Sequence, residues 1–562
     1  MIKTKHILPL VAAIVVAAAA NALAQTNNTA QGRRGRFGEP QRGVYKDRIV
    51  PHWFAADTKF WYRNDLRGEA REFILVDTEK GTRQPAFDHD KLAAALSKAA
   101  QHEYKSDHLP ISDLEFNDDA KTVKFGAADK KWECDLNSYQ CKETGGSAGK
   151  STSSLVEPDD SVAMTRPVAS YLLSPIADED DKAPNDDADD EDRGRRSRKS
   201  PDGKWTAFAR GGNVFLRSQD GAERQLSQDG TTNHAYGLIE WSPESDVVVA
   251  WHIEPGDRKE VFNIESSPKD GGRAILHRRP YAQAGDKFTH YELNLFDVAT
   301  GKQSRPSVDQ YEHEWEPPRL HWLPDKHRLA YEQVDRGHQR LRVIAVDART
   351  GEVRNLVDES SKTFIWTAHN EMLNVNYVNW MDKSDEMIYV SERDGWRHLY
   401  LIDTKDGSLK NQITKGPWVV RGIDRIDEDA RQVWFHAGGM NAGQDPYFVH
   451  YYRINFDGTG LTALTDGDGN HTVQYSGDRK FLIDTHSRVD MPPVNNLRKT
   501  SDGSLVCELE KADISELKES GWQAPEVFVS KGRDGESDIW GIICRPKNLD
   551  PSKKYPVLEN IY

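Results

Sequence analysis

The stretch "VNWMDKSDEMIYV" (Val378–Val390) is one copy of a unit that recurs along this chain of 562 residues. Each copy opens with an aromatic or apolar residue, continues through a polar turn, and ends in an alternating strand. Most copies are spaced by roughly 40 to 60 residues, a period typical of propeller blades. The repetition predicts one supersecondary unit used many times. The eight copies begin at His52, Leu114, Lys199, Ile239, Leu320, Val378, Arg425 and Val473.

Several units also close with a common turn, in which a strand ends in Asp and Gly follows four residues later. The Asp carboxylate accepts hydrogen bonds from nearby backbone N–H groups, and Gly takes the positive φ that reverses the chain. The pattern therefore predicts a second hairpin in these units and a structural role for the aspartates. The pairs are Asp77 with Gly81, Asp297 with Gly301, Asp347 with Gly351, and Asp403 with Gly407.

Two hairpins per unit make a four-stranded antiparallel sheet. A series of such sheets predicts an all-β fold, a β-propeller of eight four-stranded blades, because radial packing hides the sheet edges and leaves a central channel. The stretch "HDKLAAALSKAAQH" (His89–His102) is the clearest exception, since it has the pattern of an amphipathic helix.

The N-terminus has the pattern of a secretory signal peptide. Lys3 and Lys5 precede the apolar run "ILPLVAAIVVAAAA", which leads to the small-residue motif at residues 22–24. The run is shorter than the roughly 20 residues that a spanning helix needs, so a membrane span is the weaker interpretation. We therefore expect a signal peptide over 1–24, a disordered tail over 25–44, and a protein exported to the periplasm or the extracellular space without a membrane span.

The charge of the chain limits its partners. Acidic residues outnumber basic ones by 90 to 75, which gives a formal net charge of −15. Nucleic acid is an unfavourable partner for such a surface, because phosphate binding needs a basic face. Much of the negative charge lies in "ADEDDKAPNDDADDED" (Ala177–Asp192), which basic residues follow. A block of this composition buries no apolar area, so we expect a disordered insertion over 177–199.

Four cysteines are few for an exported chain of this length. Cys134 and Cys141 flank a polar turn in "WECDLNSYQCKE", and we predict a disulfide across that hairpin. A zinc site is the competing interpretation, but the spacing comes without a matching His cluster. The sequence leaves the pairing of Cys507 and Cys544 open. We expect no metal and no organic cofactor.

Three stretches imitate catalytic or metal motifs. "GGSAGKST" (Gly145–Thr152) matches a nucleophile-elbow spelling but lacks a preceding strand and a following helix, so we expect a flexible loop. "HEYKSDH" (His102–His108) has Ser106 where a zinc-protease helix needs its second His. "DGDGN" (Asp466–Asn470) is followed by His471 where a calcium loop needs Gly. None of them is expected to be a site.

The stretch "YVNWMDKSDEMIYVSERDGWRHLYLID" (Tyr377–Asp403) resembles the N-terminal propeller of the dipeptidyl peptidase IV family, within the prolyl oligopeptidase group of serine peptidases. "SPDGKWTAF" (Ser200–Phe208) and "WSPESDVVVAW" (Trp241–Trp251) support the match. The last stretch, Gly535–Tyr562, is similar to the first strands of the family's α/β-hydrolase domain. The resemblance implies a propeller over 45–530 and the start of a truncated hydrolase domain over 531–562.

The resemblance also implies where catalysis resides. In an α/β-hydrolase the nucleophilic Ser lies at an elbow and Asp and His follow it, so all three would come after Tyr562. We expect no catalytic residue in this chain, and no peptidase activity from the chain as given. The run Tyr555–Leu558 is expected to be a buried strand that joins the central sheet of the peptidase domain.

The expected function is to gate and select oligopeptide substrates of an exported serine peptidase. Family members that release dipeptides carry two adjacent Glu residues before the "WSP" opening, where this chain has "TNHAYGLIEWSP" (Thr232–Pro243) with only Glu240 acidic. Dipeptide release and oligopeptidase activity both stay open, and the substrate-binding residues are unknown. "YEHEWE" (Tyr311–Glu316) is expected to be a solvated loop.

Two further points stay open at this stage. The full-length protein could form a homodimer, which the sequence leaves undecided. A free-standing propeller that binds peptides or proteins without catalysis is the alternative function, although a lone propeller has no reason to carry the hydrolase-like tail.

Overall fold

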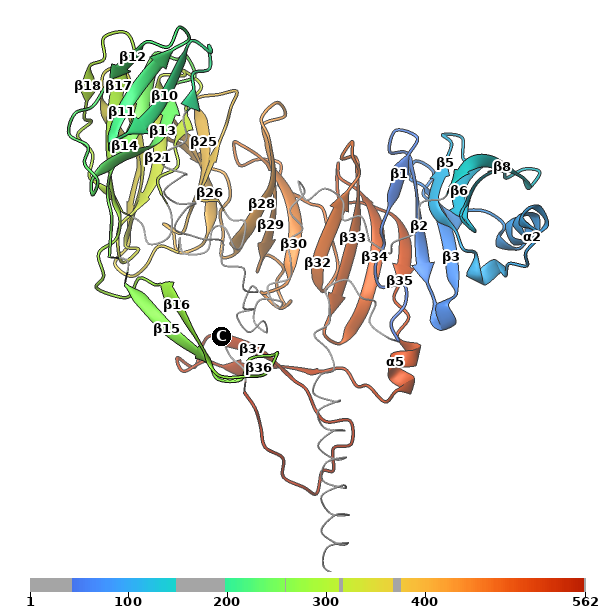
Figure 1. The fold of residues 1–562 in the computed structure, drawn as a ribbon. Helices are drawn as coiled ribbons and strands as arrows, with labels where there is room; N and C mark the ends of the chain where they lie inside the picture. The colour runs from blue at the N-terminus through green and yellow to red at the C-terminus, as the bar shows by residue number, and fades with distance from the viewer. Residues whose placement is uncertain (1–42, 148–197, 258, 313–316, 367–375, 560–562) are drawn as a thin grey trace, which may run out of the picture. The chain divides into compact units, whose positions relative to one another are not determined.

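The computed structural model describes residues 43–147, 198–257, 259–312, 317–366 and 376–559, which Figure 1 shows as a series of small sheets. The predicted signal peptide and nearly all of the predicted tail lie outside the described residues, as does the acidic insertion up to residue 197. Across the described ranges, none of the helices has the length and apolar character needed to cross a membrane.

The chain divides into two compact units. The first draws on Met1–Gly149, Val489–Asn495 and Glu508–Lys553. The second draws on Lys150–Arg488, Asn496–Cys507 and Lys554–Tyr562. The predicted propeller region 45–530 therefore contributes to both units.

Two four-stranded sheets and a two-stranded hairpin lie in the first unit. The first sheet consists of β1 (His52–Phe54), β2 (Lys59–Asp65), β3 (Arg71–Asp77) and β4 (Thr82–Pro85). The second consists of β5 (Ser112–Phe116), β6 (Thr122–Ala127), β7 (Lys130–Asp135) and β8 (Gln140–Ser147). The hairpin consists of β36 (Glu526–Lys531) and β37 (Asp538–Ile543). The helices of the first unit are η1 (Arg67–Glu69), α2 (His89–Ala100), η2 (Ser106–His108) and α5 (Ser515–Glu519).

Five sheets and a hairpin lie wholly in the second unit. The strands of its first sheet are β9 (Arg198–Lys199), β10 (Trp205–Arg210), β11 (Asn213–Ser218) and β12 (Glu223–Gln225). The next sheet has β13 (Ala235–Trp241), β14 (Val247–Glu254), β17 (His290–Asp297), β18 (Gln303–Ser304) and β19 (Tyr311–Glu312), and the hairpin has β15 (Glu260–Glu265) and β16 (Ile275–Pro280). The third sheet consists of β20 (His321–Trp322), β21 (Arg328–Val334), β22 (Arg340–Asp347) and β23 (Val353–Ser360). The fourth consists of β24 (Val378–Trp380), β25 (Glu386–Ser391), β26 (His398–Asp403) and β27 (Leu409–Gln412). The fifth consists of β28 (Val419–Asp427), β29 (Gln432–Gly438), β30 (Val449–Asn455) and β31 (Thr462–Ala463).

One further sheet has the order β32 (Asn470–Tyr475), β33 (Phe481–Arg488), β34 (Met491–Lys499) and β35 (Leu505–Lys511). The described ranges thus contain eight sheets of four or more strands, and in each of the seven four-stranded sheets neighbouring strands are consecutive in sequence. Each of the eight predicted unit starts lies in or next to the first strand of one of them. The expected all-β class with four-stranded, propeller-type sheets is confirmed.

The predicted closing turns are present. Asp297 Oδ1 accepts a hydrogen bond from the backbone N–H of Thr300 at 2.6 Å, and Gly301 has φ +74°. Asp403 Oδ1 likewise accepts from the backbone N–H of Lys405 at 2.8 Å, and Gly407 has φ +79°. Only Gly adopts this φ without a Cβ clash, so the Asp-to-Gly spacing sets the turn between the third and fourth strands.

The core of the first unit lies between its two sheets and α2. Trp61, Phe73 and Trp132 pack there with the apolar face of α2, whose Leu92 and Leu96 are buried. The predicted helix is confirmed over His89–Ala100, and Asp88 caps it by accepting a hydrogen bond from the backbone N–H of Lys91 at 3.1 Å.

The largest core cluster of the second unit joins three successive sheets. Their strands are buried on both faces and carry Leu, Val, Ile and aromatic side chains that pack against the next sheet. Tyr389 and Phe435 are among its fully buried large side chains. Neighbouring sheets therefore cover each other's faces, as expected for blades that stack face to face.

Three sequence-based expectations require correction. No strand forms at Tyr555–Leu558, where Val557 is 89% and Leu558 95% exposed, because a strand needs a neighbour for its backbone groups and no described strand pairs there. The expected solvated loop at Tyr311–Glu316 begins as β19, which pairs with β17 and buries Tyr311. The expected flexible loop begins within β8, which includes Gly145–Ser147; residues 148–152 lie outside the described residues.

The predicted start of the hydrolase domain at residue 531 coincides with the last residue of a strand. β36 extends from Glu526 to Lys531 and pairs along its whole length with β37. A division between residues 530 and 531 would separate the last residue of β36 from its strand.

Candidate functional site: a buried histidine cluster

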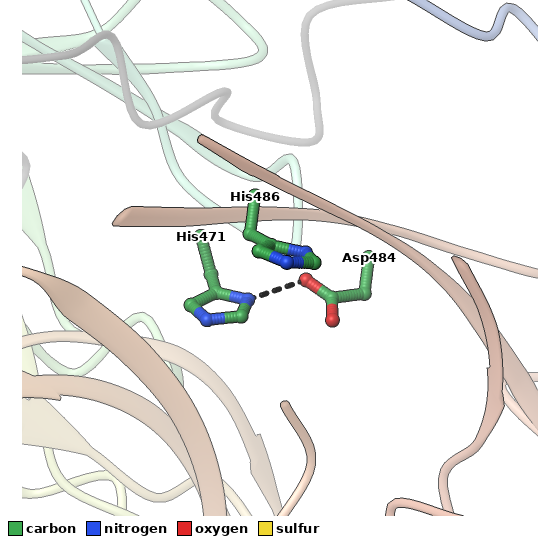
Figure 2. Close-up of side chains that lie close together, drawn as sticks. All are labelled: His471, Asp484 and His486. Atoms are coloured by element: carbon green, nitrogen blue, oxygen red, sulfur yellow. Dashed lines mark hydrogen bonds and ion pairs between the residues drawn. The ribbon is translucent and has the colours of Figure 1, made fainter. Parts of the chain in front are cut away.

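Two neighbouring strands bring two histidines and an aspartate together. β32 and β33 pair antiparallel, with His471 opposite His486 and Val473 opposite Asp484. Asp484 and His486 are two residues apart on β33, so their side chains emerge on the same face, which is also the face of His471. Figure 2 shows the three side chains turned toward one another.

The cluster is tight and excluded from solvent. His471 Nδ1 lies 2.6 Å from Asp484 Oδ1, and the side chains of both residues are 0% exposed. One potential ligand atom from each of His471, Asp484 and His486 lies within 4.8 Å of the other two. The rings of His471 and His486 stack with centroids 5.0 Å apart. Such a group is either a hydrogen-bonded ion pair or a set of metal ligands.

A third histidine comes from the neighbouring sheet. His450 lies on β30, and its ring centroid is 4.5 Å from that of His471. Its Nε2 is 2.9 Å from the side-chain oxygen of Gln444, a geometry in which Nε2–H donates and Nδ1 keeps a lone pair. That Nδ1 is buried and has no hydrogen-bond partner among the residues that the structure describes, and the same is true of His486 Nδ1.

The carboxylate of Asp484 divides its contacts between two groups. Arg498 Nε donates to Asp484 Oδ2 at 2.9 Å, while Oδ1 faces His471. Arg498 Nη2 also donates to the backbone carbonyl of Asp466 at 3.1 Å. The guanidinium therefore fixes the orientation of the carboxylate and leaves Oδ1 directed at the imidazoles.

The surroundings keep two of the imidazoles neutral. Burial, reinforced by the neighbouring His471, lowers the pKa of His450 to about 4. Burial also lowers the pKa of His486, and His471 adds to that shift. Desolvation disfavours the charged form of a base, so both side chains carry a free lone pair at neutral pH.

Gly467 leaves room beside the rings. A Cβ at this position would lie 3.3 Å from His486 Nε2, and the φ of Gly467 is +121°. Its carbonyl oxygen is 3.4 Å from His471 Nε2. The "DGDGN" stretch, which was not expected to be a site, thus forms one wall of the cluster.

The sequence did not identify this cluster. His450, His471 and His486 are dispersed over three strands, and no short spacing motif unites them. The one local signal is Asp484 and His486 at alternate positions of a strand, which places both side chains on one face. Joining them to His471 requires the hairpin register, and joining His450 requires the packing of two sheets.

The disulfide candidates lie where the sequence places them. Cys134 on β7 and Cys141 on β8 are directly opposite in the antiparallel register, and the structure joins them by a disulfide with Cα atoms 4.1 Å apart. Cys507 is half-buried on β35, and Cys544 is exposed. Glu240 is half-buried on β13, and burial raises the pKa of its carboxyl group.

A half-buried cation lies on β28. Burial, together with the nearby Arg397, lowers the pKa of Arg421, and no carboxylate of the described residues forms an ion pair with it. A guanidinium in such surroundings is poorly compensated. It can accept the carboxylate or carbonyl oxygens of a ligand in place of lost water. No pattern in the sequence marks this position, because its character depends on burial.

Comparisons with known proteins agree on one family. The model described as "Dipeptidyl peptidase IV (DPP IV) N-terminal region" matches residues 169–493. The dipeptidyl peptidase 4 of Trichophyton tonsurans is 22% identical over 389 residues, and the probable dipeptidyl peptidase 4 of Aspergillus fumigatus is 24% identical over 399 residues. Each alignment covers 65% of this chain and 49% of the relative, so the chain spans about half the length of these relatives.

Two solved structures are similar in part. The dipeptidyl peptidase 4 of Porphyromonas gingivalis is 18% identical with a TM-score of 0.46, and the match covers 91% of this chain and 66% of that one. A putative dipeptidyl aminopeptidase IV from Bacteroides ovatus is 16% identical with a TM-score of 0.45, covering 91% of this chain and 67% of that one.

Proposed function

The chain belongs to the family of the dipeptidyl peptidase IV N-terminal region, and from this we propose that it is the propeller portion of an exported serine peptidase that acts on oligopeptides. The observation that carries the proposal is the family match over residues 169–493, more than half of the 562 residues. The eight propeller-type sheets support it.

The proposed task of this portion is to gate and select substrate. In a closed propeller the blades restrict access to a central channel, which would admit short or unfolded peptides and exclude folded proteins. The catalytic Ser, Asp and His are proposed to belong to a hydrolase domain outside this chain, so the chain by itself is proposed to be inactive. Dipeptide release is the favoured chemistry because the curated relatives are dipeptidyl peptidases.

Arg421 is the residue that we propose for contact with the peptide. It presents a cation that no described carboxylate neutralises, and Arg397 lies near enough to lower its pKa further. A peptide supplies the missing partner through a carboxylate or a backbone carbonyl oxygen. The two adjacent Glu residues of family members that release dipeptides are absent before Trp241, so we propose that other groups take their place in this chain.

The hairpin β36–β37 favours a peptidase over a free-standing binding propeller. Val529, Ile539 and Ile542 are 47%, 53% and 52% exposed, although strands of this composition normally face a core. We propose that this hairpin packs against the hydrolase domain. Export to the periplasm or extracellular space, with a signal peptide over 1–24, and homodimerisation of the complete protein belong to the same proposal.

The test compares two purified proteins. One is produced from the complete reading frame that contains this sequence, and the other is the chain ending at Tyr562. We expect the complete protein to release an N-terminal dipeptide from a chromogenic substrate, to lose that activity with a serine-directed inhibitor, and to spare a folded protein substrate. The shorter chain should show no turnover. Turnover by the shorter chain, or none by the complete protein, would reject the proposal.

A further inference from the structure

We propose that His471, Asp484 and His486 bind a divalent transition-metal ion, Zn²⁺ by preference, and that His450 supplies a fourth ligand. The site lies in the sheets β28–β31 and β32–β33 and takes no part in the proposed peptidase function. Its proposed role is structural, because a closed four-ligand site joins the strands that carry its ligands.

The donor set matches the metal. Zn²⁺ is bound in proteins by imidazole nitrogens and carboxylate oxygens at about 2.0 to 2.2 Å, so any two ligands of one ion lie within about 4.4 Å. The three potential ligand atoms of His471, Asp484 and His486 are already within 4.8 Å of one another. Small side-chain rotations therefore suffice to bring them onto one ion.

The unpaired nitrogens point to a missing ligand. His450 Nδ1 and His486 Nδ1 are both buried, and neither has a hydrogen-bond partner within the described ranges of the chain. Leaving a buried polar atom unsatisfied costs about 1 to 3 kcal/mol. A metal ion accepts both lone pairs and removes this penalty.

The outer contacts resemble those that orient metal ligands. Gln444 binds His450 Nε2 at 2.9 Å, which directs the lone pair of Nδ1. Arg498 holds Asp484 Oδ2 at 2.9 Å and leaves Oδ1 for the metal. Gly467 adds space, since any larger residue would press on His486.

Metal binding exchanges one proton for a divalent ion, so the site gains one positive charge. In the metal-free state a proton lies between His471 Nδ1 and Asp484 Oδ1, 2.6 Å apart. The metal replaces that proton, which passes to solvent, while the carboxylate of Asp484 and the nearby acidic Asp466 and Asp468 offset the cation against Arg498. No oxidation or reduction is involved.

The geometry predicts what binding does to the fold. β30 and β32 belong to two different sheets that lie side by side. An ion held by His450 on β30 and by His471 on β32 crosslinks these sheets. We therefore expect zinc to raise the thermal unfolding temperature of the full chain, because a ligand that binds only the folded state stabilises it.

The first experiment measures metal on the intact chain. The protein is stripped with a chelator and titrated with Zn²⁺ by calorimetry and with Co²⁺ by visible absorption. The expected result is one ion per chain, a d–d spectrum of a tetrahedral site, and proton release on binding. The absence of a saturable site, or a spectrum of octahedral hydrated Co²⁺ only, would overturn the proposal.

Variants locate the ion. His486→Gln should abolish the Co²⁺ spectrum, and Gln444→Ala should weaken Zn²⁺ affinity by about 10- to 100-fold through loss of ligand orientation. The matched control is His436→Gln, because His436 Nδ1 makes a similar, partly buried contact with Asp424 Oδ1 at 2.8 Å in the sheet that carries His450. Circular dichroism establishes that each variant is folded.

Two outcomes measured on folded variants would contradict the assignment. Binding that survives in a folded His486→Gln protein would place the ion on other histidines. Loss of binding in the His436→Gln control would likewise place the ion on histidines other than the proposed ligands.

Discussion

Tyr62 on β2 donates a hydrogen bond to Glu510 on β35 at 2.9 Å, although 448 residues separate them in sequence. Asn64 Nδ2 donates to the same carboxylate oxygen at 2.6 Å, and the guanidinium of Arg83 forms an ion pair with it. Tyr62 and Glu510 are both buried, and burial together with this carboxylate raises the pKa of the phenol. The two ends of the first unit are therefore tied through one acidic side chain.

This contact predicts a large effect of Glu510→Ala. Removing the carboxylate leaves the guanidinium of Arg83 without its ion-pair partner and the donors of Tyr62 and Asn64 without this acceptor. Breaking a buried charged pair costs about 3 to 5 kcal/mol. We expect a clear fall in the urea midpoint of the full chain. Glu508→Ala is the control, since Glu508 is exposed on the same strand and should change the midpoint little. Equal effects of the two variants would contradict the assignment.

Glu386 predicts an acid-sensitive contact. Arg431 and Lys410 bind its carboxylate and lower its pKa from 4.5 to about 2. A carboxyl group with a depressed folded-state pKa stabilises the fold above its unfolded pKa, and that contribution is lost as the pH falls from about 4.5 toward 2. Urea midpoints measured between pH 5 and pH 3 should decline less steeply in Glu386→Gln than in the parent protein. Parallel declines would show that other groups control the acid response.

The disulfide predicts a moderate loss of stability on reduction. The bridge closes a loop between cysteines seven residues apart, and constraining a loop of that size stabilises a fold by about 2 kcal/mol. The double variant Cys134→Ala, Cys141→Ala should therefore unfold at lower urea concentration. Added reductant should lower the midpoint of the parent protein but leave that of the double variant unchanged. A response of the variant to reductant would implicate other thiols.

Arg421 predicts opposite changes in stability and binding. Arg421→Leu removes a poorly compensated cation, so the unfolding temperature should rise. The same change removes the proposed contact with peptide, and loss of one ion-paired hydrogen bond should weaken oligopeptide binding about tenfold. Fluorescence anisotropy with a labelled peptide measures the second effect.

The matched control for Arg421 lies on the same strand. Arg425 Nη2 contacts Asp427 Oδ2 at 2.8 Å and is thus already paired. Arg425→Leu should lower stability slightly and leave peptide affinity unchanged. A fall in stability for Arg421→Leu, without a change in binding, would assign Arg421 a purely structural role.

Local chemistry was enough for the sequence to determine the repeated unit and its turns. The eight unit starts, the Asp-to-Gly closures such as Asp297 with Gly301, and the helix at His89–Ala100 depend on residues a few positions apart. Hydrophobic periodicity and positive-φ glycines act over that short range, so both can be recognised in the sequence alone. The pairing of Cys134 with Cys141 was predictable for the same reason.

The strands, contacts and burial that depend on residues far apart in the sequence could be seen only in the tertiary structure. Tyr311 becomes part of β19 because β17 has a free edge to pair with, and Tyr555–Leu558 forms no strand because no described strand is available to it. The histidine cluster needs the register of β32 with β33 and the packing of β30 beside them. Burial, which sets both the pKa of His450 and the isolation of Arg421, arises only when sheets stack, and no local pattern encodes it.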